Sequence, residues 1–240
     1  MATFVLVHGA WHGGWCWQRV RDRLTELGNG RHTVYTPTLS GLAERRHLIR
    51  YPIDLNTHVT DIVNLITWED LHDVVLCGHS FGGLVVTGAA DALGDRIGAL
   101  VYLDAFVPEN GDTGASVGRI PPPEGVLVPS PPAAFFGLSG AAAEWVETRL
   151  TPHPAATTTT PLRLRGNCRA ARTYALATGW PGLDALRDCY ARAAADPTWM
   201  TRKIDGSHDL MVDRPDDVAD LLLEAAASVS SARQRADRLG

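Results

Sequence analysis

Hydrophobic and polar positions show two kinds of pattern along this chain. Six short apolar runs are rich in β-branched residues and end at turn residues, whereas the stretches between them repeat apolar residues every three or four positions. The short runs predict strands buried on both faces, and the longer period predicts amphipathic helices. The predicted strands are residues 4–7, 33–36, 73–77, 99–103, 172–177 and 200–205.

Stretches with helical spacing alternate with these strands. Gly28 stops the first helix, and Pro215 suits the first turn of the last one. Alternation of strand and helix predicts an α/β fold with a mostly parallel sheet, right-handed crossovers and helices on both faces. The predicted helices are residues 17–27, 59–66, 82–93, 183–190 and 215–225.

The alternation breaks after the fourth predicted strand. Residues 106–167 are irregular and rich in Pro, Ala and Thr, with one weak helical stretch near residues 140–150. A connection of about 60 residues is too long for a plain loop in a folded domain. We therefore expect a core made of residues 1–105 and 168–240, with residues 106–167 inserted as a cap over a site.

Gly78-His79-Ser80-Phe81-Gly82 is the strongest chemical signal in the chain. It follows a predicted buried strand and precedes a predicted helix of small residues. This is the strand–turn–helix context in which a G-x-S-x-G sequence exposes a nucleophilic serine. The glycines let neighbouring segments approach the sharp turn. Ser80 is therefore predicted to be a nucleophile.

A serine that attacks a carbonyl needs backbone N–H groups aimed at the developing oxyanion. With this motif one N–H comes from the residue after the serine, here Phe81, and the other from a loop after an early strand. His8-Gly9-Ala10-Trp11 directly follows the first predicted strand. We expect the N–H groups of Ala10 and Phe81 to form the oxyanion hole.

Serine also needs a base, and the chain has nine histidines. His208 follows the last predicted strand at the same sheet edge as Ser80, and it is the predicted base. Asp104 ends the fourth predicted strand, where a carboxylate needs a partner, so it is the favoured acid. Asp184 and Asp188 remain alternatives. Histidines with no motif around them are assigned surface or structural roles: His32, His47, His58, His72 and His153.

Four segments, residues 4–17, 78–83, 99–108 and 206–215, together resemble the plant methylesterase and hydroxynitrile lyase branch of the α/β-hydrolases. They resemble its bacterial relatives more closely still. The resemblance covers nearly the whole chain outside residues 106–167. It implies the α/β-hydrolase fold, with Ser80 as nucleophile, His208 as base and the N–H groups of Ala10 and Phe81 as the oxyanion hole.

Two positions depart from that branch. The plant enzymes carry their aspartate after the fifth strand, where this chain has Trp180, and this favours Asp104 instead. Haloalkane dehalogenases resemble this arrangement, but they would need an aspartate in place of Ser80. The lyases carry a lysine after the catalytic histidine, where this chain has Asp209, and the opposite charge argues against cyanohydrin cleavage.

Aromatic side chains follow several of the predicted strand ends and recur in the predicted cap. Such residues above the catalytic edge predict a small, largely apolar or aromatic substrate. The predicted pocket residues are Trp11, Phe106, Phe135, Phe136, Trp145 and Trp180.

Composition narrows the remaining choices. The chain has 22 basic and 27 acidic side chains and a net charge of −5, without the basic excess that nucleic-acid binding needs. No apolar run is long enough to span a membrane, and no secretory signal is recognisable. The four cysteines follow no metal or disulfide spacing. We expect a cytoplasmic protein that needs no metal or cofactor and binds a small-molecule substrate, with a homodimer left open.

These features predict a serine hydrolase that cleaves small, largely apolar or aromatic carboxylic esters through a Ser-His-Asp triad and an acyl-enzyme. Methyl esters and carbamates would use the same groups, because His208 only protonates the leaving group. Two alternatives remain open. One is a C–C bond hydrolase or lyase on the same scaffold, and the other is a small-ligand-binding protein without turnover.

Overall fold

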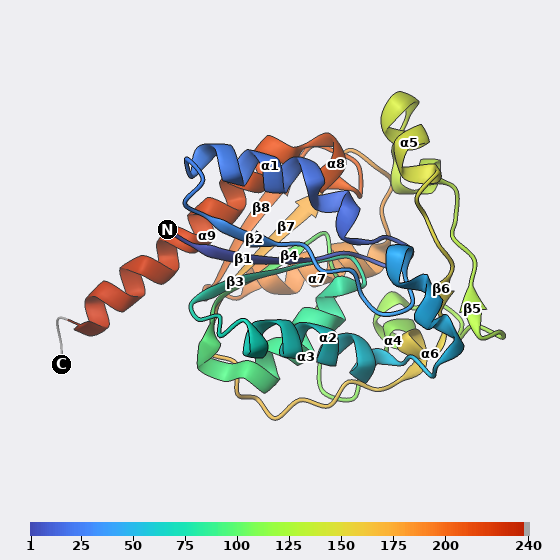
Figure 1. The fold of residues 1–240 in the computed structure, drawn as a ribbon, viewed down its shortest axis with the longest axis horizontal. Helices are drawn as coiled ribbons and strands as arrows, with labels where there is room; N and C mark the ends of the chain where they lie inside the picture. Colours follow the sequence, from blue (N-terminus) through green and yellow to red (C-terminus); the bar gives the residue numbers. More distant parts are fainter. Residues whose placement is uncertain (238–240) are drawn as a thin grey trace.

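Six parallel strands form the central sheet, in the order β2-β1-β3-β4-β7-β8. The computed structural model describes the backbone of residues 1–237 and the side chains of residues 1–230 (Figure 1). Every residue of β3, in the middle of the sheet, is buried, as expected for a strand covered on both faces. The strands are β1 (Thr3–Val7), β2 (Thr33–Tyr35), β3 (Val74–His79), β4 (Ile97–Leu103), β7 (Ala171–Ala177) and β8 (Trp199–Ile204).

Helices cover both faces of this sheet. Helices α1 (Gln18–Leu27) and α9 (Pro215–Asp237) pack together on one face, while α2 (Leu55–Trp68) and α3 (Gly82–Leu93) pack together on the other (Figure 1). Helix α7 (Asp184–Ala195) packs on β7 and β8. The chain thus has the predicted three-layer α/β architecture, with its core between the sheet and these helices.

Short helical turns complete the core. They are the 3₁₀ turns η1 (Gly14–Trp17), η2 (Ala43–Arg50) and η3 (Gly94–Arg96) and the helix α8 (Leu210–Asp213). The sequence did not predict η2 or α8, because such short segments carry no helical hydrophobic period. Tertiary hydrogen bonds hold η2, since Arg45 donates to the carbonyl of Thr38 over 2.8 Å and to Asp61 over 3.3 Å.

The segment between β4 and β7 contributes no strand to the central sheet. It contains α4 (Gly114–Gly118), η4 (Ala133–Phe136), α5 (Gly140–Glu147), α6 (Ala156–Thr159) and a small antiparallel pair, β5 (Leu127–Val128) with β6 (His153–Pro154). These elements lie beyond the carboxyl ends of the strands (Figure 1). We call residues 106–167 the inserted segment.

A buried carboxylate anchors the far end of this segment to the core. Asp91 on α3 accepts hydrogen bonds from the backbone N–H groups of Arg165, Gly166 and Asn167, over 2.7, 2.7 and 2.9 Å. The chain is therefore tied to α3 just before it enters β7. Within residues 1–237, no helix combines the length and apolar character that a membrane crossing requires.

Candidate active site

Ser80 occupies a strained turn between β3 and α3. Its φ angle is +53°, in the left-handed region that side chains other than glycine rarely adopt. Backbone hydrogen bonds hold this conformation. The N–H of Ser80 donates to the carbonyl of Leu103 over 3.3 Å, and the carbonyl of Ser80 accepts from Gly83 and Phe106 over 3.1 Å each. The surrounding strands and helix thus impose the strain on Ser80.

Glycine is required where α3 begins. A Cβ atom on Gly82 would lie 2.7 Å from the carbonyl oxygen of His8 and 2.9 Å from that of Val7. Backbone atoms cannot move aside as a side chain would. This close approach brings the start of α3, and with it Ser80, against the end of β1, where Gly9 and Ala10 follow.

We expect Gly82→Ala to lower the free energy of unfolding by about 1–3 kcal/mol, the usual cost of overpacking. Urea denaturation measures this loss. Gly125→Ala is the matched control, because its Cβ would meet no atom closer than 3.6 Å. Equal stability of the two variants would contradict the close approach of α3 to β1.

The three predicted catalytic side chains form one hydrogen-bonded chain. The hydroxyl Oγ of Ser80 lies 2.9 Å from Nε2 of His208, and Nδ1 of the same ring lies 2.6 Å from Oδ2 of Asp104. Asp104 is fully buried and His208 nearly so. The side chains come from the turn after β3, the end of β4 and the loop after β8. All three positions lie at the carboxyl edge of the sheet, as the sequence predicted.

Backbone and side-chain donors surround the carboxylate of Asp104. Its Oδ1 accepts from the N–H of Ala177 over 3.1 Å, and its Oδ2 accepts from the indole N–H of Trp180 over 3.2 Å as well as from His208. Asp104 itself has a φ of +42°, and its N–H donates to Ala175 over 2.7 Å. These hydrogen bonds fix the carboxylate in one orientation and satisfy its oxygens away from water.

The two alternative acids lie elsewhere. Asp184 is exposed and pairs with Arg187 over 3.3 Å, and Asp188 pairs with Arg119 over 2.6 Å. Neither reaches His208, so the open choice among the three aspartates falls to Asp104 on geometry.

Trp180 has a contact that its sequence did not predict. It was expected only as a pocket wall, yet its indole holds Asp104 while its ring lies 4.6 Å from the ring of His208. Phe136 stacks at 6.0 Å from the same imidazole, and its carbonyl accepts from the backbone N–H of His208 over 2.8 Å. Packing of these two rings against the imidazole therefore restricts its plane, which stays in line with Ser80 and Asp104.

Ala10 and Phe81 line the same cavity as Ser80. Within the described residues, neither backbone N–H has a hydrogen-bond acceptor. Trp11, the residue after Ala10, has a φ of +66°, so the loop after β1 is strained as well. Two unpaired donors beside a serine hydroxyl suit a developing negative charge on a substrate oxygen.

A second buried acid lies next to His208. Asp209 is fully buried, and its Oδ2 lies 3.1 Å from Nε2 of His12. Burial alone would raise the pKa of the Asp209 carboxyl, but the nearby His12 outweighs burial, and the pKa is lowered. His79 is also close, with Nε2 3.8 Å from Oδ1 of Asp209, and this nitrogen donates to the carbonyl of His208 over 3.0 Å.

An apolar cavity of about 180 Å³ opens above Ser80 and His208. Five of the six predicted pocket residues line it, and so does the oxyanion pair. Phe135 is 47% exposed and stands at its mouth, whereas Phe136 is buried. The predicted residues that line the cavity are Trp11, Phe106, Phe135, Phe136 and Trp180.

Trp145 is the exception, because it does not line this cavity. Its ring packs edge-on against Trp15, with centroids 5.1 Å apart, and the guanidinium groups of Arg19 and Arg149 lie 5.5 and 4.8 Å from it. Helix α5 turns this side chain toward η1 and α1, where the cations favour an aromatic face. Trp145 therefore fastens the inserted segment to the core.

The sequence missed several residues of the cavity wall. His153 was assigned a surface or structural role, but it is buried and lines the cavity. It belongs to β6, a strand of two residues without hydrophobic alternation, so no local pattern indicated its position. The other unpredicted lining residues are Gly114, Ile120, Pro121, Pro123, Val128, Thr158 and Leu183.

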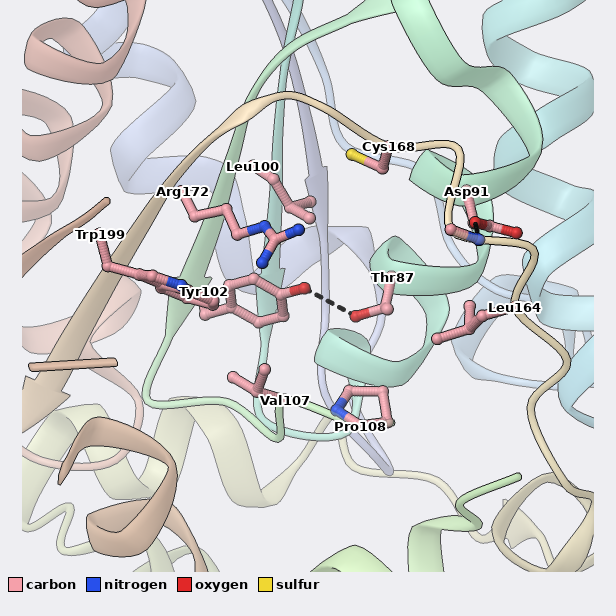
Figure 2. A pocket seen from close by; sticks show the side chains of 11 residues that line it. Thr87, Asp91, Leu100, Tyr102, Val107, Pro108, Leu164, Cys168, Arg172 and Trp199 are labelled. Carbon is pink, nitrogen blue, oxygen red and sulfur yellow. Dashed lines mark hydrogen bonds between the residues drawn. The ribbon is translucent and has the colours of Figure 1, made fainter. Parts of the chain in front are cut away.

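A second cavity of about 180 Å³ lies between α3 and the strands β4, β7 and β8. Figure 2 shows the hydroxyl of Tyr102 beside that of Thr87, 2.8 Å away, and Arg172 beside Trp199. None of the predicted catalytic residues lines this cavity. Chemistry therefore favours the cavity at Ser80 as the active site. Among the described residues, no group of three or more His, Cys, Asp or Glu is arranged to hold a metal ion.

Comparison with known proteins agrees with this architecture. A family model described as alpha/beta hydrolase family matches residues 4–221. A carbendazim hydrolyzing esterase from Nocardioides sp. is 41% identical over 245 residues, covering 92% of this chain and 98% of that protein. Methylesterase 2 of Arabidopsis thaliana is 39% identical over 110 residues, covering 44% of this chain and 40% of its own length.

Solved structures show the same fold. An extracellular alpha/beta-hydrolase from a Paenibacillus species superimposes with a TM-score of 0.77 at 24% identity, covering 94% of this chain and 99% of that one. A methylesterase from Arabidopsis superimposes with a TM-score of 0.78 at 23% identity, covering 95% and 99%. From the family match and the long Nocardioides alignment, the chain belongs to the alpha/beta hydrolase family, and it is a carboxylic-ester hydrolase.

Proposed function

We propose that this protein hydrolyses small, largely apolar or aromatic carboxylic esters through an acyl-enzyme on Ser80. The observation that carries the proposal is the hydrogen-bonded chain from Ser80 through His208 to Asp104, which ends at an apolar cavity. A nucleophile, a base and an orienting acid in contact are the parts that acyl transfer needs.

Acylation begins with attack of the Ser80 hydroxyl on the ester carbonyl. Nε2 of His208 takes the hydroxyl proton, and the imidazolium that forms is stabilised by Asp104 at Nδ1. The carbonyl oxygen becomes negatively charged and accepts from the N–H groups of Ala10 and Phe81. The C–O bond then breaks, and the leaving alcohol receives the proton from His208.

Deacylation repeats these steps with water. His208 takes a proton from the water molecule, which attacks the acyl carbonyl, and the same two N–H groups hold the second oxyanion. Collapse returns the proton to Ser80 and releases the acid. Burial of Asp104 and the packed rings beside His208 keep the base in one orientation through both halves.

The inserted segment is proposed to select the substrate as a cap. It supplies Phe135, Phe136 and His153 to the cavity, whereas the core supplies the catalytic groups. An aromatic wall favours an apolar acyl or alkoxy group. Methyl esters and carbamates fit the same mechanism, and the names of the Nocardioides and Arabidopsis relatives support testing both classes. Location in the cytoplasm and binding of a single small substrate stay predictions.

Asp209 bears on the lyase alternative. The residue after His208 is a buried carboxylate paired with His12, so the position that holds a lysine in the lyases holds the opposite charge here, which argues against cyanide binding. An aligned serine, histidine and aspartate also favour turnover over simple ligand binding. We therefore retain ester hydrolysis as the one proposed function.

Covalent trapping tests the proposal directly. Rapid mixing with p-nitrophenyl acetate should release a burst of about one p-nitrophenol per active site, followed by slower turnover. A fluorophosphonate should add to the Ser80 peptide, as read by mass spectrometry, and should abolish hydrolysis. A panel of methyl, acetyl and carbamate aryl esters then ranks substrates. Modification of another serine, with activity retained, would contradict the proposal.

Asp104→Asn should lower kcat by about 10⁴-fold with little change in KM. The asparagine amide would face Nδ1 of His208 as a donor, and the ring would then carry its proton on Nε2, toward Ser80. Steady-state kinetics on the best ester measure this loss. The exposed variant Asp184→Asn is the matched control, and an equal loss in both would move the acid away from Asp104.

A further inference from the structure

The peptide groups Gly9–Ala10 and Ala10–Trp11 flank Ala10, whose N–H is the proposed oxyanion donor. Buried histidines form hydrogen bonds with three of the four polar atoms of these groups. The carbonyl of Gly9 lies 2.8 Å from Nδ1 of His8, and the carbonyl of Ala10 lies 2.8 Å from Nδ1 of His12. The N–H of Trp11 donates to Nδ1 of His153 over 3.4 Å. The fourth polar atom is the N–H of Ala10, a residue that lines the cavity, and this N–H has no acceptor among the described residues.

The neighbours of His8 and His153 fix both rings in the neutral form. His8 donates from Nδ1 to Gly9, because its Nε2 accepts from the N–H of Leu39 over 3.1 Å. His153 accepts at Nδ1, so its Nε2–H donates to the hydroxyl of Thr157 over 2.7 Å. Burial lowers the pKa of His8 to about 3 and that of His153 well below its ordinary value.

His12 differs, because acceptors face both of its ring nitrogens. Nδ1 faces the carbonyl of Ala10, and Nε2 faces Oδ2 of Asp209 over 3.1 Å. Both nitrogens must carry hydrogen to satisfy these acceptors, so His12 is an imidazolium paired with a carboxylate. Burial lowers the pKa of His12, but Asp209 outweighs it and the pKa is raised. The other ionisable groups that interact with this pair are the neutral rings of His8 and His79, the catalytic ring of His208 and the buried thiol of Cys16.

We propose that His8, His12 and His153 are positioning residues that hold the two peptide groups around Ala10, so that its free N–H stays aimed at the oxyanion. This inference rests on the proposed function. Trp11 has a φ of +66°, a conformation that costs roughly 1–3 kcal/mol and would relax if its peptide could rotate. Hydrogen bonds from three directions prevent that rotation. His12 also ties this loop to Asp209, the neighbour of His208.

Two variants of His153 distinguish the loss of its hydrogen bond to Trp11 from a change in the size of its side chain. His153→Asn places an amide oxygen where Nδ1 accepts from Trp11, whereas His153→Phe keeps a ring but removes the acceptor. We expect kcat to fall at least tenfold in His153→Phe and by less than threefold in His153→Asn. The loss stays below the ~10²–10³-fold cost of deleting an oxyanion donor outright. His32→Phe is the matched control, since His32 also accepts a backbone N–H, that of Ala2, at the far edge of the sheet.

A transition-state mimic separates this role from a general effect on folding or substrate binding. Affinity for an aryl trifluoromethyl ketone, which forms an oxyanion on Ser80, should fall in parallel with kcat in His153→Phe. Affinity for the corresponding methyl ketone should stay within about twofold of the wild-type value. Folding is checked by circular dichroism. A folded His153→Phe variant with wild-type kcat and unchanged trifluoromethyl ketone affinity would overturn the proposal.

The ¹⁵N spectrum of histidine-labelled wild-type protein provides a test that needs no variant. Both nitrogens of His12 should be protonated at pH 7, Nδ1 of His8 should be protonated and Nδ1 of His153 should not. A bare Nδ1 on His12 or His8 would overturn the arrangement even if the variants fail to fold. Fluorophosphonate labelling of Ser80 distinguishes the two failures. If labelling succeeds and the histidine variants behave as wild type, the esterase mechanism stands and the positioning role falls.

Discussion

Ser80→Ala is expected to lower kcat about 10⁶-fold on any ester that the wild-type protein hydrolyses. Without the hydroxyl, His208 has no nucleophile to deprotonate at 2.9 Å, and no acyl-enzyme forms. Attack by water remains, helped by the N–H groups of Ala10 and Phe81, so a residual acceleration of about 10³–10⁴ over water is expected. Substrate affinity should change little, because the substitution removes only one hydroxyl group from a largely apolar wall.

Stopped-flow and long-incubation assays with a p-nitrophenyl ester cover this range of rates. Loss of the pre-steady-state burst should accompany the loss of kcat. Ser228→Ala serves as control, because its hydroxyl bonds only to Ala225 within α9. Hydrolysis by Ser80→Ala at the wild-type rate would eliminate the serine mechanism, and a lost burst with retained kcat would point to direct attack by water.

Local sequence was enough to predict where Ser80 and His208 lie in the fold. A G-x-S-x-G turn between a buried strand and a small-residue helix leaves the backbone few choices, and the observed φ of +53° at Ser80 is the strained state that this context requires. His208 follows from the position of the last strand, because parallel strands end at one edge. The same reasoning favoured Asp104, which ends β4 and now lies 2.6 Å from His208.

Residues whose role depends on a distant partner could not be predicted. Trp180 bonds to Asp104, 76 positions away, and His153 reaches Trp11 across 142 positions. The Trp180 contact arises from the loop after β7, and the His153 contact arises from the path of the inserted segment, which has little hydrophobic periodicity. Trp145 was misplaced for the same reason, since only the direction of α5 decides whether its ring meets the cavity or Trp15. Asp209 was noted for its charge, but its pairing with His12 required the three-dimensional fold.

The buried histidines are expected to make the folded protein much less stable at acidic pH. Burial lowers the pKa of four of them below 6.5, and for His8 the folded value is about 3. In the unfolded chain each ring takes up a proton below pH 6.5, so their contribution to stability is complete above that pH and declines as pH falls toward each folded pKa. The four rings are His8, His58, His79 and His153.

The contribution of His12 to stability changes with pH in the opposite direction. Asp209 raises its pKa despite burial, so its stabilisation is complete below pH 6.5 and is lost only as pH rises through the folded value. It therefore adds no proton uptake on acidification. Net proton uptake on unfolding should therefore rise as pH falls below 6.5. Each proton taken up lowers the free energy of unfolding by about 1.4 kcal/mol per pH unit. Several kcal/mol are thus lost between pH 6.5 and 5, a large share of the roughly 5–15 kcal/mol that stabilises a typical domain.

Urea denaturation at half-unit pH steps from 8 to 4.5 measures this slope. Stability should fall steeply below pH 6.5, and above pH 7 it should decline more gently as His12 alone loses its contribution. His58→Phe is the diagnostic variant, because its buried ring is not itself one of the proposed catalytic or positioning groups, although it packs 5.8 Å from His153 and 6.0 Å from Phe81. It should reduce proton uptake on unfolding. His72→Phe, on the exposed surface, should leave the slope unchanged. A stability that stays constant from pH 7 to 5 would require these rings to be charged in the folded state. The neutral hydrogen bonds assigned to His8 and His153 around Ala10 would then be wrong as well.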